Sequence, residues 1–182
     1  AHSEEDIGSP KVASAAASLQ GLNPDVRVTA IAERLSGGRL QELVKQADVV
    51  VDACDNFSTR FAVNESCIAA GKPLVSGAAI RLEGQVTVFD CRDARSPCYQ
   101  CLYQARDDDD VSCASNGVMA PVVGIIGSVQ ALETIKLIAG VGSPLVGRLV
   151  LFDGLALNWR EMKLPRDPGC EACAQRAAES TE

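Results

Sequence analysis

The run ADVVVDA, at residues 47–53, decides the fold class of this chain. Continuous β-branched runs of this length are typical of strands that are buried on both faces of a parallel sheet. Helices are predicted on either side of it, at residues 39–46 and 58–70, and a short strand follows at residues 72–76. Helices and strands that alternate over short connections indicate an α/β fold with an open parallel sheet.

The alternation of helices and strands also holds before residue 39, but the pattern changes after residue 84. Residues 10–21 predict a helix that begins with a proline, and residues 26–31 alternate like a strand. Three later segments alternate as antiparallel strands do, namely residues 85–90, 148–153 and 159–164.

We therefore expect one domain over residues 1–182. Its first part, residues 1–83, is predicted to be a Rossmann-like parallel half, and residues 84–182 a mixed or antiparallel half. Residues 119–139 predict a long helix that is apolar nearly all round, so we expect it to be buried in the core and at a subunit interface. Its Gly124 and Gly127 offer flat patches for close backbone approach.

Composition favours a globular domain and argues against nucleic-acid and membrane partners. Hydrophobic content is 47% and charged content 23%, both ordinary for a globular domain, and the net charge of −7 argues against nucleic acid as a partner. The apolar run at residues 118–129 is too short to span a bilayer, and the sequence shows no signal peptide. Eight cysteines, several at metal-type spacing, fit a reducing compartment, so we expect a cytoplasmic protein with no membrane partner.

Four of the cysteines form two Cys-x-x-Cys pairs: Cys98 with Cys101, and Cys170 with Cys173. Each pair delivers two sulfurs from one tight turn, and two such pairs can close a tetrahedral zinc site. Two local disulfides, or free thiols, are the alternatives. A zinc site would fold the end of the chain back onto its middle.

Polar residues follow the decisive strand at the point where the next helix begins. In open α/β sheets, ligands bind beyond the carboxyl ends of the strands. Asp55 and Asn56 can offer oxygens to Mg²⁺, and Arg60 lies one helical turn further on. The alternative is that Asp55 or Asn56 merely caps the helix.

Two other residues are candidates for chemistry. Lys11 stands near a predicted helix start, where a cation is unfavourable unless an anionic ligand is bound there, although an ordinary surface lysine is the alternative. Cys113 lies in a polar segment, residues 104–116, where an exposed thiol can be nucleophilic. The four aspartates of that segment equally suit a plain solvated loop.

Seven segments together resemble one protein family. They are IGSPKV at 7–12, DACDN at 52–56, SGAAIRLEGQ at 76–85, PCYQC at 97–101, GVMAP at 117–121, REMKL at 160–164 and PGCEAC at 168–173. In this order they resemble the ThiF/MoeB/HesA family of ubiquitin-activating-enzyme-like adenylyltransferases, and most of all its molybdopterin-synthase branch.

The resemblance implies an ATP-dependent enzyme of molybdenum cofactor biosynthesis, which adenylylates the C-terminal glycine carboxylate of a ubiquitin-like sulfur carrier. It implies that Lys11, Asp55 and Arg60 act in catalysis. Mg-ATP would be bound by Lys11, Asp55 and Asn56, with Asp55 holding the Mg²⁺. Cys113 would be able to form a covalent bond to the carrier. It also implies structural zinc on the two Cys pairs, a crossover loop at 104–116, a homodimer and a separate sulfur donor.

The N-terminal Gly-rich nucleotide loop of the family is missing from this sequence. Since such a loop supplies most of the amides that cradle phosphate, we expect these residues alone to bind ATP poorly and to be inactive. A thiamine-pathway adenylyltransferase is one alternative. A non-catalytic, zinc-stapled docking or dimerisation domain is the other.

Overall fold

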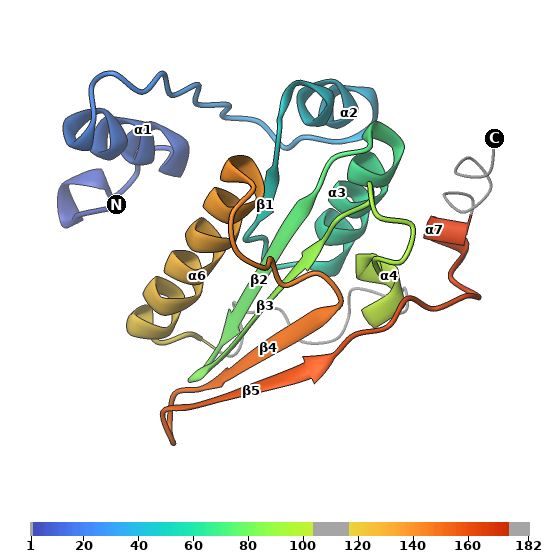
Figure 1. Cartoon of the computed structure of the whole chain (residues 1–182). Helices are drawn as coiled ribbons and strands as arrows, with labels where there is room; N and C mark the ends of the chain where they lie inside the picture. Colours follow the sequence, from blue (N-terminus) through green and yellow to red (C-terminus); the bar gives the residue numbers. More distant parts are fainter. Residues whose placement is uncertain (1, 104–116, 175–182) are drawn as a thin grey trace. The chain divides into compact units, whose positions relative to one another are not determined.

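The computed structural model of the chain describes residues 2–103 and 117–174 (Figure 1). These residues belong to two compact units, 1–35 and 36–182, and each unit is described by itself. The predicted single domain over 1–182, with its halves 1–83 and 84–182, stays a prediction.

The first unit contains a short 3-10 helix, η1 (Glu4–Asp6), and the helix α1 (Lys11–Leu22). Pro10 precedes the first turn of α1, so the helix predicted at residues 10–21 is confirmed. The strand predicted at residues 26–31 is wrong, because this segment pairs with no strand of the described residues. Its side chains are mostly exposed, so neither a hydrogen-bonding neighbour nor a buried face holds it as a strand.

The second unit is built on one mixed sheet, with its strands in the order β1 (Val50–Asp52), β2 (Leu74–Ile80), β3 (Glu83–Phe89), β4 (Arg148–Asp153) and β5 (Asn158–Lys163). β1 and β2 are parallel, whereas β2–β3, β3–β4 and β4–β5 are antiparallel. The sheet is therefore mixed, and its pairing changes from parallel to antiparallel at β2, which is parallel to β1 and antiparallel to β3.

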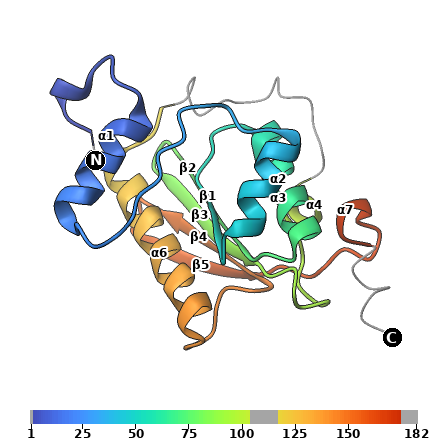
Figure 2. The same cartoon turned by 90° about the horizontal axis from the view of Figure 1, so that it is seen from above.

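Helices cover both faces of this sheet (Figure 2). On one face lies α6 (Ala120–Ala139), and on the other lie α2 (Gly37–Gln46) and α3 (Phe57–Ala70), with two short helices, α4 (Tyr99–Leu102) and α7 (Glu171–Ala174), beside α3. The main core lies between α6 and the sheet, where Val122 and Ile126 pack on Val75, Val86 and Val88. The predicted α/β class is confirmed.

Close approach between α6 and the sheet depends on two glycines in the strands. A Cβ atom at Gly84 would lie 2.4 Å from Ile126, and one at Gly77 would lie 2.3 Å from Gln130. Gly124 and Gly127 are not used in this contact, because nothing described lies within 4 Å of a Cβ at either position, so close approach at these two glycines stays a prediction. The strands, not the helix, supply the flat surface.

One side of α6 is buried in the core, which confirms that part of the prediction, while its burial at a subunit interface stays a prediction. Val122, Ile126, Gln130 and Glu133 face the sheet. Leu132, Ile135 and Ile138 on the other side are 56%, 59% and 66% exposed. By length and composition α6 could cross a membrane. The core helices of soluble proteins often meet the same two criteria, so this is weak evidence for a membrane span.

The decisive strand is shorter and more open than predicted. β1 spans three residues, and of these only Asp52 is buried, while Val51 is 48% exposed. Burial on both faces was expected and is not seen, and β1 lies at the edge of the described sheet, where it pairs with β2 alone.

Candidate functional site

A pocket of about 320 Å³ opens beside the carboxyl ends of β1 and β2. It lies where the turn between β1 and α3, the β2–β3 hairpin, α4, and the strands β4 and β5 come together, all within the second unit. Its walls include the residues Asp55, Asn56, Phe57, Arg60, Ile80, Glu83, Gln85, Tyr99, Tyr103, Phe152, Asp153 and Arg160. Its place agrees with the rule that ligands of open α/β sheets bind beyond the strand ends.

The turn that carries Asp55 is fixed by the buried carboxylate of Asp52. Asp52 Oδ1 accepts a hydrogen bond from the Cys54 amide at 2.9 Å, and Oδ2 accepts one from Ser76 Oγ at 3.3 Å. On α6, Gln130 Nε2 donates to the Asp52 carbonyl at 2.8 Å and to the Val75 carbonyl at 3.2 Å. The end of β1 is thus held from β2 and from α6.

Arg60 lines the pocket, but its guanidinium is already committed to protein acceptors. Nη1 pairs with Asp52 Oδ2 at 3.1 Å, and Nη2 donates to the carbonyl of Gly77 at 3.0 Å and to that of Cys54. The residue is 6% exposed. This geometry supports a positioning residue that fixes the turn before Asp55, whereas the sequence predicted a residue that contacts the nucleotide.

Asn56 caps α3, as the alternative interpretation of the sequence held. Its Oδ1 accepts hydrogen bonds from the Thr59 amide and from Ser58 Oγ, both at 2.9 Å, while its Nδ2 donates to Asp55 Oδ1 at 3.2 Å. Asp55 itself is exposed at the pocket and has no buried partner in the described chain. Asp55 is thus the carboxylate of this turn that is open to a cation, and Asn56 orients it.

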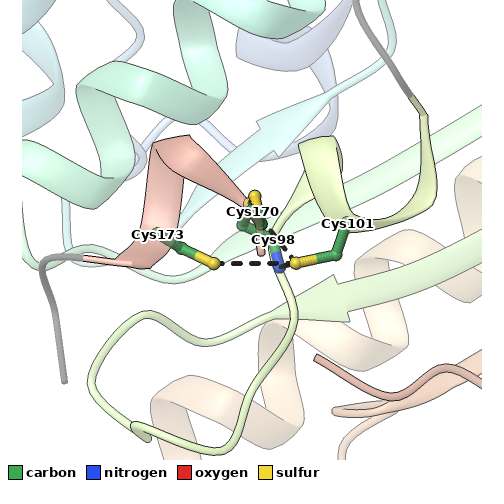
Figure 3. Close-up of side chains that lie close together, drawn as sticks. All are labelled: Cys98, Cys101, Cys170 and Cys173. Atoms are coloured by element: carbon green, nitrogen blue, oxygen red, sulfur yellow. Dashed lines mark hydrogen bonds between the residues drawn. The ribbon is translucent and has the colours of Figure 1, made fainter. Parts of the chain in front are cut away.

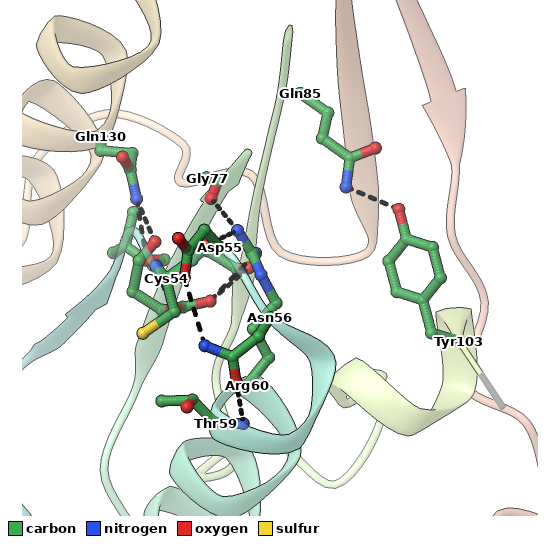
Figure 4. A network of polar contacts seen from close by, with 12 residues as sticks. Cys54, Asp55, Asn56, Thr59, Arg60, Gly77, Gln85, Tyr103 and Gln130 are labelled. Atoms are coloured by element: carbon green, nitrogen blue, oxygen red, sulfur yellow. Dashed lines mark hydrogen bonds and ion pairs between the residues drawn. The ribbon is translucent and has the colours of Figure 1, made fainter. Parts of the chain in front are cut away.

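Aromatic side chains build the pocket wall opposite the strands. Tyr99 and Tyr103 of the α4 segment have ring centroids 5.0 Å apart, and Phe57 meets Tyr103 edge-on at 5.7 Å. Gln85 Nε2 of β3 donates to the Tyr103 hydroxyl at 2.6 Å across the pocket (Figure 4). Burial raises the pKa of Tyr99 above its ordinary value.

Cys54 lies in the same turn but is a poor nucleophile. Burial, followed by its hydrogen bond with Asp52, raises the pKa of Cys54 to about 12. Since the thiolate is the reactive form, a neutral thiol here indicates a packing role.

The two Cys pairs meet in one cluster, as predicted (Figure 3). Sγ of Cys98 lies 3.6 Å from that of Cys170 and 3.8 Å from that of Cys101, and Cys101 Sγ lies 3.6 Å from Cys173 Sγ. Four sulfurs around one tetrahedral zinc, each at about 2.3 Å, would be about 3.8 Å apart. Because the cysteines are free and their sulfurs are this far apart, the cluster fits a metal and not two local disulfides.

The chemistry of the cluster also fits a cation. Burial raises the pKa of Cys98 and of Cys101, so without a positive charge nearby these two thiols stay protonated at neutral pH. A bound metal ion deprotonates its thiol ligands and replaces the solvation that burial removes. Arg166 lies beside this cluster, and a hydrogen bond with the Cys173 side chain raises its pKa further.

Two predicted residues cannot be placed at the pocket. Lys11 is the first residue of α1 and is exposed, but it belongs to the first unit, whereas Asp55 belongs to the second. Their common role in binding ATP therefore stays a prediction. Cys113 and the crossover loop at 104–116 lie outside the described residues.

Sequence reasoning missed several residues of this site. Asp52 and Gln85 lie in segments that carry the family resemblance, but no local pattern indicates a role for them or for Tyr103, because their contacts are with residues elsewhere in the chain. Gln130 did leave a local signal, since it is a polar residue in a long apolar helix, where a buried amide needs a specific partner. That partner is the backbone at the carboxyl end of β1.

Comparison with known proteins agrees with this geometry. The ThiF family matches residues 1–172, and the chain belongs to that family.

Among curated relatives, the molybdopterin-synthase adenylyltransferase of Escherichia coli is 46% identical over 96% of this chain and 70% of its own length. The sulfur carrier protein ThiS adenylyltransferase of the same organism is 41% identical over 93% of this chain and 66% of its own length. The fold is shared with Escherichia coli MccB, solved with ATP, at a TM-score of 0.76 and 20% identity. That match covers 95% of this chain but 54% of MccB, so the chain spans about half of the solved structure.

Proposed function

We propose that this chain belongs to an ATP-dependent adenylyltransferase that activates the C-terminal glycine carboxylate of the molybdopterin-synthase sulfur carrier, in molybdenum cofactor biosynthesis. The observation that carries the proposal is the pocket beside the exposed carboxylate of Asp55, in a chain 46% identical to a molybdopterin-synthase adenylyltransferase. The pocket walls combine aromatic and aliphatic side chains with polar and charged ones, which suits an extended peptide end with small residues beside a charged nucleotide.

In this reaction a carboxylate oxygen of the carrier forms a bond to the α-phosphorus of ATP. The bond from that phosphorus to the α,β-bridging oxygen breaks, and pyrophosphate leaves. Because the nucleophile belongs to the carrier, the enzyme needs to supply position and electrostatic stabilisation only. This accords with a pocket whose described walls carry polar and charged side chains, and in which the nearby Cys54 is a neutral thiol.

Asp55 is the residue that would hold Mg²⁺, which prefers one or two carboxylates together with phosphate oxygens. Bound there, the ion would neutralise charge on the phosphates. Arg60 acts indirectly in this proposal, as a positioning residue, because its bonds to Cys54, Asp52 and Gly77 keep the turn with Asp55 in place. Lys11 is proposed to contact the phosphates.

Carrier-dependent exchange of labelled pyrophosphate into ATP tests the proposal on the complete gene product that contains these residues. Asp55→Asn should lower the exchange rate by about 100-fold, since a lost metal ligand removes several kcal/mol of charge stabilisation. Asp48→Asn is the matched control, because Asp48 is also an exposed aspartate but precedes β1 at the end away from the pocket. No carrier-dependent exchange, or equal effects of the two changes, would favour the non-catalytic docking domain.

The identity of the carrier separates the two branches of the family. The ThiS adenylyltransferase is 41% identical to the chain, against 46% for the molybdopterin-synthase enzyme. We expect faster exchange with the small subunit of molybdopterin synthase than with ThiS, in parallel reactions at equal carrier concentration. The reverse order would assign the chain to the thiamine pathway.

Further features extend the proposal. The Cys98, Cys101, Cys170 and Cys173 cluster is proposed to bind structural zinc. The exposed side of α6, with Leu132, Ile135 and Ile138, is proposed to form a homodimer interface. Monomeric proteins rarely leave several neighbouring large apolar side chains exposed to water, so a second copy of the chain is proposed to cover them. A cytoplasmic location, a separate sulfur donor and the absence of nucleic-acid or membrane partners remain predictions.

A further inference from the structure

One polar atom in the segment between β5 and α7 is buried without a partner. Arg166 Nε is the single buried side-chain nitrogen or oxygen with no hydrogen-bond partner within residues 2–103 and 117–174. Buried unpaired donors are rare in native proteins, because the hydrogen bond to water is lost and nothing replaces it. Such an atom indicates that Arg166 is kept for a role besides packing.

The remaining donors of Arg166 bind one carbonyl of the second Cys pair and one in the segment before the first pair. Nη2 donates to the carbonyl of Cys173 at 2.7 Å, and Nη1 donates to the carbonyl of Ala94 at 3.2 Å. Cys173 belongs to the second Cys pair, and Ala94 lies four residues before Cys98 of the first pair. One guanidinium therefore links the second Cys pair to the segment that leads into the first pair, and it also lies beside the Cys173 side chain.

The position of Arg166 matters because the metal-bound Cys cluster would be negatively charged. Four thiolates around one divalent ion carry two net negative charges. Cys98, Cys170 and Cys173 are only 1%, 6% and 0% exposed, so water cannot compensate that charge well. A guanidinium is permanently positive and offers several donors in one plane, which suits it to stabilise neighbouring anionic groups.

We propose that Arg166 is an outer-shell residue of the Cys98, Cys101, Cys170 and Cys173 metal site. Its positive charge offsets part of the negative charge of the zinc–thiolate cluster, and its two carbonyl contacts hold the Cys pairs at the spacing that the metal requires. The inference rests on the zinc site proposed above and is independent of the adenylylation reaction.

Zinc affinity of the purified, zinc-loaded chain, measured by competition with a chromogenic chelator at fixed pH, tests the inference. Arg166→Ala should weaken zinc binding by about 10- to 100-fold, as loss of outer-shell partners does in other sites. Arg95→Ala is the matched control, because Arg95 lies next to Ala94 but its side chain is 92% exposed and pairs with Asp93. The control should keep the wild-type affinity.

Two further variants separate charge from simple packing. Arg166→Lys keeps the charge, whereas Arg166→Gln keeps hydrogen-bonding capacity without it, so the Lys variant should hold zinc more tightly. This comparison also decides the matter if the Ala variant fails to fold. Wild-type affinity in the Ala variant, or equal affinity in the Lys and Gln variants, would overturn the inference. A wild-type chain without zinc would overturn the metal site as well, while leaving pyrophosphate exchange as a separate test of the enzyme.

Discussion

The buried ion pair between Arg60 and Asp52 should be one of the most sensitive points of the fold. Their side chains are 7% and 1% exposed, so Arg60→Met would leave the Asp52 carboxylate buried without its cation. Asp52 would keep the neutral donors of Cys54 and Ser76 but no cation, and the carbonyls of Cys54 and Gly77 would each lose a donor. Breaking a buried pair in this way costs about 3–5 kcal/mol.

A loss of this size is a large fraction of the stability of a typical domain, about 5–15 kcal/mol. Urea unfolding followed by circular dichroism measures it. With a slope of about 2 kcal/mol per molar urea, the midpoint should fall by roughly 2 M while the slope stays the same. The same change should also slow pyrophosphate exchange, because the Asp55 turn loses its anchor.

Arg95→Met is the control for this experiment, because the Arg95–Asp93 pair is exposed and should leave the midpoint unchanged. Adding Asp52→Asn to Arg60→Met should recover part of the loss, since it removes the uncompensated charge. If Arg60→Met shifts the midpoint no more than Arg95→Met does, the assignment of Arg60 as the anchor of this turn is refuted.

Three other changes test separate features. Cys170→Ser should abolish stoichiometric zinc and lower the melting temperature, because metal binding is coupled to folding; unchanged zinc content by mass spectrometry would contradict the four-ligand site. Leu132→Glu with Ile135→Glu should convert a dimer to a monomer in light scattering, while Leu155→Glu, also at an exposed leucine, should not. Because its pKa rises from 9.0 to about 12, folded Cys54 should react with iodoacetamide at pH 8 on the order of a thousandfold more slowly than in urea. Equal rates would show an unburied thiol.

Local patterns predicted much of the second unit. β4 matches residues 148–153, and α2, α3, β3 and β5 differ from their predicted bounds by one or two residues at either end. These elements are amphipathic or clearly alternating, so the period of their apolar residues is sufficient evidence. The segment at residues 26–31 shares that alternation but is no strand, since a strand also requires a neighbour, and the sequence pattern of one segment cannot supply it.

The site was predictable only in part. The Cys-x-x-Cys spacing was sufficient to predict the four-Cys cluster, because the two cysteines of each pair are close in the sequence and four thiols together are specific for a metal site. Asp55 was found through its place after a buried strand. Arg60 was found too, but its role was not, since its partners include Gly77, which is 17 positions away in the sequence.

By itself, the sequence determined the class of fold, the order of most helices and strands, the two Cys pairs and the turn that carries Asp55. Each of these depends on residues close together in the chain. Only the tertiary structure decided that Gln130 holds the end of β1, that Arg60 is an anchor, that Arg166 links Cys173 to Ala94 and that one side of α6 stays exposed. The physical reason is that hydrogen bonding, ion pairing and burial depend on distances in space, which local periodicity does not encode.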